Sequence, residues 1–183
     1  METWKEFENN EITHSAAHHL MAIAYLLQEY GYARVTDVAK RLGITRGSAS
    51  ITLKALREKG YIIEDENKFL RLSSEGNTLA QLIRSKRKIL IKFFKDVLKV
   101  DPAKAEIDAC KIEHLISIET SGRLLTFVKF LFSNEQSAQE LLEMFKKFEV
   151  NCPDAEICPI CPVGAEDCLL AGEMPMVQIE KKK

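Results

Sequence analysis

The sequence lacks the features of several large protein classes. No apolar run approaches the roughly 20 residues that a membrane-spanning helix needs. The first six residues, Met-Glu-Thr-Trp-Lys-Glu, are polar and contain no apolar segment of the kind found in secretory signals. We therefore expect a cytoplasmic protein without a membrane partner. In such a reducing compartment the five cysteines are better interpreted as metal ligands or free thiols than as disulfides.

The sequence also lacks the local motifs of common enzymes. It has no glycine-rich phosphate loop, no nucleophile elbow and no pair of carboxylates that can be placed in a cleft. We therefore predict that the protein is not an enzyme. Its 183 residues, with an ordinary apolar share, suffice for one domain or two small ones.

Charge is unevenly distributed along a chain whose net charge is only −1. Residues 31–60 carry 7 Lys and Arg against 2 Asp and Glu, and residues 81–100 carry 7 against 1. A basic stretch at 31–60 suits a surface that faces phosphate groups. A solvated face without a partner would have the same charge, so the local sequence pattern must decide.

The first 72 residues contain the signals of three helices and a hairpin. The expected elements are a helix over 13–30 ending at Gly31, a helix over 37–42 capped by Thr36, a helix over 46–59 capped by Thr45, and strands over 61–64 and 68–72. This order predicts a winged helix-turn-helix. A small helical domain with an unrelated hairpin is the alternative.

Four further helices are expected after the hairpin. They are a long helix from Ser73 to about Lys99, a helix opened by Asp101-Pro102, a helix after Ser117 and a helix after Ser133 or Asn134. They are too apolar for a small monomer to bury fully, which predicts a homodimer. The predicted fold is mainly α: a winged helix-turn-helix DNA-binding domain (1–73), a helical dimerisation domain (74–149) and a cysteine-rich tail (150–183).

The second helix of a helix-turn-helix lies in the major groove of double-stranded DNA. Arg46 is the only residue in its first turns that can make a bidentate contact to guanine. Lys54 and Arg57 lie farther along, where phosphate contact is expected, and Thr45 could serve only as a helix cap. The predicted DNA contacts are Thr36, Thr45, Arg46, Gly47, Ser48, Ser50, Lys54, Arg57 and, in the wing, Lys68.

Six segments within about residues 12–133 follow one known pattern. They are Ile12-Thr-His-Ser, Val35-Thr-Asp-Val-Ala-Lys-Arg-Leu-Gly, Thr45-Arg-Gly-Ser-Ala-Ser, Leu56-Arg-Glu-Lys-Gly-Tyr-Ile, Leu70-Arg-Leu-Ser-Ser-Glu-Gly and Glu106-Ile-Asp-Ala-Cys-Lys-Ile-Glu-His-Leu-Ile-Ser. They resemble the diphtheria toxin repressor and manganese transport regulator family of iron- or manganese-dependent winged-helix repressors, in its short two-domain form. The resemblance implies a homodimer that binds a palindromic operator when a divalent metal is present.

The resemblance also implies a metal site made by His18, Cys110, Glu113 and His114, with His18 where the family usually has methionine or aspartate. Independently of the family, the last three lie at positions i, i+3 and i+4, on one helical face. Thiolate, carboxylate and imidazole ligands suit Fe²⁺, Zn²⁺ or Co²⁺. We favour Fe²⁺, with Mn²⁺ or Zn²⁺ as alternatives. A buried cysteine beside a surface Glu–His pair is the interpretation without a metal.

Two departures from the family pattern concern metal ligands. By position, Arg87 and Ile91 replace a histidine and a glutamate of the family's second metal site, so we expect that site to be lost. In this alignment Arg87 would place a fixed positive charge where the second ion lies. His14 and Met21 flank His18 on the same helical face and are alternative ligands for the first site.

The tail places four cysteines within 17 residues: Cys152, Cys158, Cys161 and Cys168. Interleaved prolines stiffen the segment and disfavour a helix, which suits a loop around a metal centre. One C-x₂-C pair with a neighbouring Cys–Pro favours a [4Fe–4S] cluster. Structural Zn²⁺ is the next interpretation, although zinc ribbons usually have two such pairs, and uncoordinated redox thiols are the third.

The patterns together predict a metal-dependent transcriptional regulator, a repressor by resemblance, with iron favoured as its signal. The alternative is a metal-independent winged-helix regulator. It would sense redox state or oxygen through the cysteine tail, or hold a purely structural zinc there.

Overall fold

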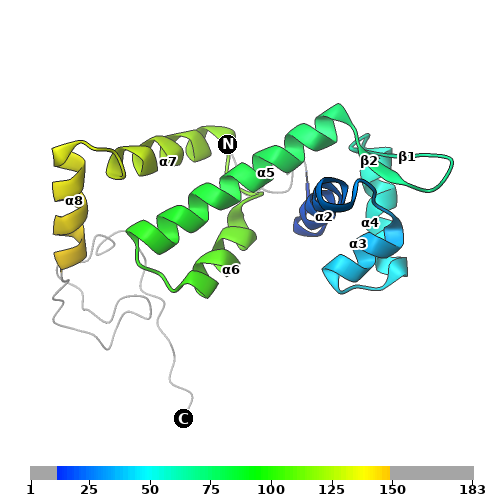
Figure 1. The fold of residues 1–183 in the computed structure, drawn as a ribbon, viewed down its shortest axis with the longest axis horizontal. Coiled ribbons are helices and arrows are strands. Elements are labelled where there is room, and N and C mark those ends of the chain that lie inside the picture. The colour runs from blue at the N-terminus through cyan, green and yellow to red at the C-terminus, as the bar shows by residue number, and fades with distance from the viewer. Residues whose placement is uncertain (1–11, 149–183) are drawn as a thin grey trace, which may run out of the picture. The chain divides into compact units, whose positions relative to one another are not determined.

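The computed structural model describes residues 12–148 (Figure 1). The four tail cysteines lie outside these residues. In chain order the elements are α2 (His14–Tyr30), α3 (Val35–Leu42), α4 (Arg46–Glu58), β1 (Ile62–Glu64), β2 (Leu70–Leu72), α5 (Ser74–Lys92), the π-helix η1 (Phe93–Val97), α6 (Pro102–Ile112), α7 (Ile118–Leu131) and α8 (Gln136–Lys147). The fold is mainly helical, as predicted. The chain divides into two compact units between Glu135 and Gln136, so α8 belongs to the second unit.

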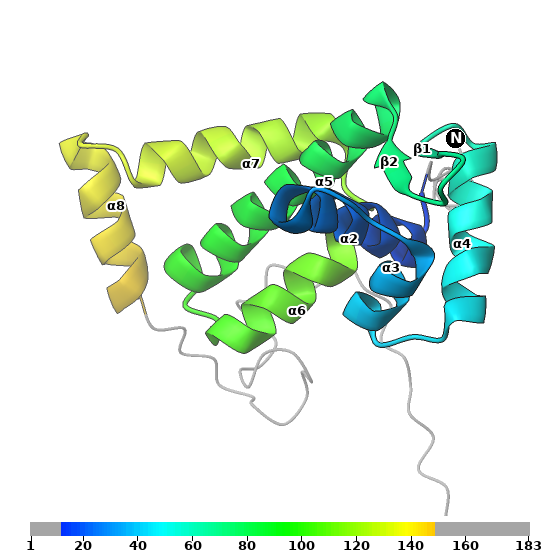
Figure 2. The same ribbon diagram turned by 45° about the vertical axis from the view of Figure 1, so that its right-hand side comes forward.

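The three N-terminal helices and the β1–β2 hairpin occur in the order predicted for a winged helix-turn-helix. The strands are antiparallel, with Ile62 opposite Leu72. These elements share one apolar core with the first half of α5, and its buried side chains include Leu20, Ile23, Val38, Leu56, Leu70 and Ile83. Because α5 contributes to this core and also contacts α6 and α7, it connects the N-terminal domain to the later helices (Figure 2).

The start of α3 differs from the prediction. The helix begins at Val35, and the Oδ2 atom of Asp37 accepts a hydrogen bond from the backbone N–H of Arg34 at 3.1 Å. This bond satisfies a donor that the helix start leaves unpaired, and the helix begins two residues before the predicted start at Asp37. Thr36 therefore lies inside the first turn, and its prediction as the N-cap is wrong. Gly43, with φ of 66°, ends the helix as predicted.

The start of α5 depends on a close approach to the hairpin. The hydroxyl of Ser73 accepts a hydrogen bond from the N–H of Gly76 at 3.0 Å, which confirms Ser73 as the N-cap. A Cβ atom on Gly76 would lie 1.9 Å from the carbonyl oxygen of Tyr61. Glycine is therefore required at this position for the helix to pack against the chain that enters β1.

The end of α5 also differs from the prediction of one α-helix to about Lys99. The α-helix ends at Lys92 and continues as a π-helix, in which the N–H of Leu98 donates to the carbonyl of Phe93 at 3.0 Å. The helical segment therefore ends at Val97, two residues before the predicted end. Lys99 follows with a left-handed φ of 60°.

Helices α6 and α7 begin where the sequence predicted, whereas α8 begins at Gln136, later than a cap at Ser133 or Asn134 would place it. Asp101 accepts hydrogen bonds at the start of α6, and Ser117 does so at the start of α7. Large apolar side chains of these two helices are exposed in the single chain, namely Ile107, Ile118, Phe127 and Phe130. None of the helices within residues 12–148 combines the length and apolarity of a membrane span.

Candidate metal centre and DNA-binding surface

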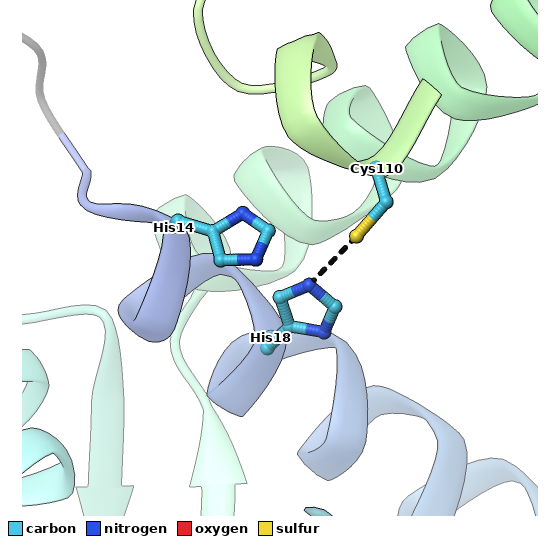
Figure 3. Close-up of side chains that lie close together, drawn as sticks. All are labelled: His14, His18 and Cys110. Carbon is cyan, nitrogen blue, oxygen red and sulfur yellow. Dashed lines mark hydrogen bonds between the residues drawn. The ribbon is translucent and has the colours of Figure 1, made fainter. Parts of the chain in front are cut away.

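Two histidines of α2 and one cysteine of α6 form a group that could hold a metal ion (Figure 3). His14 and His18 are one helical turn apart and present both imidazole rings to α6. The Nε2 atom of His18 lies 3.0 Å from the Sγ atom of Cys110, and the candidate ligand atoms of all three residues lie within 4.8 Å of one another. The group therefore joins the first helix to a helix some ninety residues later.

Partial burial shifts the pKa values of His18 and Cys110 so that both side chains favour their neutral forms. Burial, with a smaller effect from the charge of His14, lowers the pKa of His18 and favours its neutral, metal-binding form. Burial raises the pKa of the Cys110 thiol, and the positive charge of Arg87 opposes that rise. A divalent ion would stabilise the thiolate, as metals do for coordinating cysteines.

The carboxylate of Glu113 lies beside this group and is completely buried. Neither oxygen has a hydrogen-bond partner within the described part of the chain. Its charge partner is Arg87, whose Nε atom lies 3.5 Å from Oε2. Burial outweighs the effect of Arg87 and raises the pKa of Glu113 to about 7. A buried carboxylate without hydrogen bonds is costly, and the ion pair with Arg87 compensates this one only in part.

His114 completes the surroundings of the group. Its ring centroid lies 5.0 Å from that of His14, and its Nδ1 atom is buried without a hydrogen-bond partner among the described residues. Burial lowers the pKa of His114. Imidazole, thiolate and carboxylate donors of this kind fit a divalent transition metal.

The structure thus brings together His18 and Cys110 of the four predicted ligands. Glu113 and His114 lie next to them, but Glu113 faces Arg87. His14, which the sequence offered only as an alternative ligand, stands in the group itself. The i, i+4 spacing of His14 and His18 was the signal that could have placed it there.

The predicted DNA contacts lie on exposed surface of α3, α4 and the hairpin. The predicted residues in and just before α4 are all exposed, as are Thr36 and Lys68. Thr45 caps α4, because its hydroxyl accepts a hydrogen bond from the N–H of Ser48 at 3.1 Å. A groove of about 390 Å³ between α4 and the hairpin is lined by Arg46, Ser50, Lys54, Arg57 and Lys68, among others.

One acidic residue in this groove was not singled out from the sequence. Glu64 of β1 contacts Arg57 at 2.5 Å and Lys68 at 3.2 Å. Two of the predicted phosphate contacts are therefore paired with one carboxylate. The fold creates this arrangement, because Arg57 belongs to α4 and Glu64 to the strand that follows it.

Two models of known protein families match this chain. One family model, the iron dependent repressor N-terminal DNA binding domain, matches residues 11–70. A second, the iron dependent repressor metal binding and dimerisation domain, matches residues 73–142. The two cover most of the chain. It belongs to the iron-dependent repressor family.

Curated relatives match this chain over nearly their whole length. The HTH-type transcriptional regulators MntR of Bacillus velezensis and Bacillus subtilis are 28% and 27% identical over 137 residues, which is 75% of this chain and 96% of each relative. Among solved structures, the metal-dependent transcriptional regulator MtsR matches with a TM-score of 0.59 at 20% identity, covering 65% of this chain. The manganese regulator SloR matches with a TM-score of 0.58 at 19% identity, covering 62%. The match spans about half of each solved chain, 55% and 53%.

The chain is therefore a metal-dependent transcriptional repressor that binds operator DNA as a dimer, and not an enzyme. Both the candidate metal ligands and the exposed face of α4 lie within the matched residues. The exposed apolar side chains of α6 and α7 belong to the matched dimerisation domain. The sequence prediction of family, fold class and homodimeric DNA binding is confirmed.

Proposed function

We propose that a divalent ion held between α2 and α6 controls operator binding by this repressor. The observation that carries the proposal is the 3.0 Å approach of His18 to Cys110 across two helices. His14, His18 and Cys110 would hold the ion, with Glu113 and His114 as further ligands. When bound, the ion supplies a bridge between these helices and charge compensation for the buried thiolate and carboxylate.

The chain's own packing explains how this bridge would reach the DNA. Helix α2 carries Leu20 and Ile23 into the core that supports α4. Helix α6 packs along α5 and belongs to the matched dimerisation domain. Fixing α2 against α6 therefore fixes each α4 relative to the dimer. Two recognition helices can bind a palindromic operator only at a spacing set by the turn of the duplex.

We further propose that α4 enters the major groove. In this arrangement Arg46 contacts base edges, and the small polar side chains from Thr45 to Ser50 allow a close approach of the helix. Lys54, Arg57, Lys68 and Thr36 contact phosphates. The exposure of these residues on one surface supports this assignment.

Fe²⁺ is the favoured signal, with Mn²⁺ and Zn²⁺ as alternatives. The support comes from the donor set: thiolate and imidazole ligands suit iron and zinc, whereas Mn²⁺ prefers oxygen ligands. The manganese regulator SloR is a structural neighbour, which keeps Mn²⁺ among the candidates.

The test is a titration of operator binding with Fe²⁺ (anaerobic), Mn²⁺ and Zn²⁺, on an operator selected from random duplexes. We expect metal to strengthen binding by the wild type, and His18→Ala to need at least about 100-fold more metal. Glu29→Gln is the control, since Glu29 is an exposed residue of α2 about three turns from His18, and it should respond like the wild type. Operator binding that is equally tight without metal would favour the alternative, a regulator that does not sense metal through this site.

We also propose that Cys152, Cys158, Cys161 and Cys168 bind a [4Fe–4S] cluster, with structural Zn²⁺ as the alternative. The support is the sequence spacing alone. Anaerobically purified wild type should contain iron and sulfide, and Cys158→Ala should lose both. Zinc without sulfide in the wild type would establish the structural-zinc alternative instead.

A further inference from the structure

Arg87 of α5 lies against the candidate metal centre without being able to bind a cation. Its Nε atom is 3.5 Å from Oε2 of Glu113, and its side chain is 27% exposed. The charge of Arg87 also acts on Cys110 and on His18, whose pKa values it lowers. A fixed positive charge thus stands within electrostatic reach of three candidate ligands.

The surroundings of Glu113 explain why a cation is needed there in the metal-free protein. The carboxylate is fully buried and accepts no hydrogen bond from the described residues. An uncompensated buried charge is strongly unfavourable, and Arg87 is the charge partner that the structure records for it. Arg87 therefore stabilises the ionised carboxylate before any metal arrives.

The same charge works against a divalent ion. In the deprotonated form that would hold the ion, the Cys110 thiolate and the Glu113 carboxylate carry two negative charges, and Arg87 reduces the net charge of the group to −1. A divalent ion then brings the net charge to +1, whereas without Arg87 it would bring it to zero. The repulsion between guanidinium and ion falls off slowly in a partly buried site, so it lowers the affinity for metal.

We propose that Arg87 competes with the divalent ion for the negative charge of the metal centre and thereby sets the metal concentration at which the repressor responds. This inference rests on the proposed metal site. In the metal-free state Arg87 pairs with Glu113. Metal binding weakens that pair, and the partly exposed side chain can move toward solvent.

The test measures metal affinity directly, separately from DNA binding. Metal-free wild type, Arg87→Met and Arg87→Lys are titrated with Mn²⁺, followed by the loss of its free EPR signal, and with Co²⁺, followed by its visible spectrum. The binding assigned to the centre is the part that His18→Ala removes. Arg84→Met is the matched control, because Arg84 lies one turn earlier on α5, is exposed and donates a hydrogen bond to Gln28.

We expect Arg87→Met to bind metal about 10- to 100-fold more tightly than the wild type, because a full charge near the ion is removed. Arg87→Lys and Arg84→Met should stay within about threefold of the wild type, since both keep the charge at the centre. The metal-free form of Arg87→Met should unfold at a lower temperature than metal-free wild type, because Glu113 loses its partner.

Unchanged or weaker metal binding by Arg87→Met would overturn the inference while leaving the metal site intact. If His18→Ala removes no binding of Mn²⁺ or of Co²⁺, that result would instead overturn the proposed metal site. Should Arg87→Met fail to fold, the wild type still gives a test, in which the ¹⁵N resonance of Arg87 Nε should shift when Zn²⁺ is added. A resonance that does not move would overturn the inference equally.

Discussion

The carboxylate of Glu64 on β1 pairs with the guanidinium of Arg57 on α4 at 2.5 Å. Its other oxygen lies 3.2 Å from the ammonium group of Lys68. Both cations belong to the surface that we assign to DNA phosphates. The free repressor therefore holds two phosphate-binding side chains on a protein carboxylate, which DNA must displace.

Replacing that carboxylate should strengthen DNA binding. We expect Glu64→Gln to bind DNA about threefold to tenfold more tightly, since Arg57 and Lys68 are released and a negative charge near the phosphates is removed. Fluorescence anisotropy at several salt concentrations would measure this. The gain should appear with unrelated duplexes as well as with the operator, because phosphates carry no sequence information. A weaker complex would show that Glu64 positions Arg57 for DNA.

Arg46 and Lys54 should contribute to DNA binding in different ways. Arg46→Ala should lose about 1–3 kcal/mol of discrimination between the operator and unrelated DNA, as expected when a bidentate base contact is removed. Lys54→Ala should weaken binding to both duplexes alike and lower the salt slope by about one. Competition binding with the operator and an unrelated duplex would distinguish the effects of Arg46→Ala and Lys54→Ala. Equal effects of the two variants on discrimination would contradict the assignment of Arg46 to base edges.

Cys110 should be a thiolate ligand of the bound ion. In Co²⁺-loaded protein, the difference spectrum between wild type and Cys110→Ser should contain a thiolate-to-cobalt charge-transfer band. The four tail cysteines contribute equally to both proteins and cancel in the difference. Glu29→Gln, at an exposed position of α2 about three turns from His18, should give no such difference. The absence of the band from the Cys110→Ser difference would remove Cys110 from the ligand set.

Gly76 should be intolerant of any side chain. Gly76→Ala should destabilise the protein by about 3 kcal/mol or more, because the new Cβ would lie 1.9 Å from the backbone oxygen of Tyr61. Urea denaturation of the metal-free protein would measure the free energy of unfolding. Gly122→Ala on the exposed face of α7 is the control, with no atom within 4 Å of the added Cβ. It should stabilise the protein by about 0.5–1 kcal/mol, since glycine in a helix is unfavourable. Similar free energies of unfolding for Gly76→Ala and Gly122→Ala would show that the backbone can shift at residue 76.

Much of the fold could be predicted because its signals are local. Capping side chains at Thr45, Ser73, Asp101 and Ser117 lie within three residues of the groups they bind, so the sequence shows both partners. The start of α3 was mispredicted for a related reason. Thr36 and Asp37 are both good capping residues, and the sequence does not show which one the backbone uses.

The candidate metal group could be predicted only in part. Spacing on a helix placed Cys110, Glu113 and His114 on one face, but α6 ends at Ile112, so Glu113 and His114 follow the chain as it leaves the helix. The pairing of Glu113 with Arg87 depends on how α5 packs against α6. No spacing within either helix contains that information.

The sequence by itself determined the order of the elements, most of their capping residues and the residue types available for DNA and metal, because these follow from contacts between near neighbours in the chain. Tertiary structure alone decided that His14 and His18 meet Cys110, that Arg87 stands against a buried Glu113, and that Glu64 faces Arg57. Each of these contacts joins different elements. Distance and burial, which set the strength of charge interactions, exist only once those elements have packed.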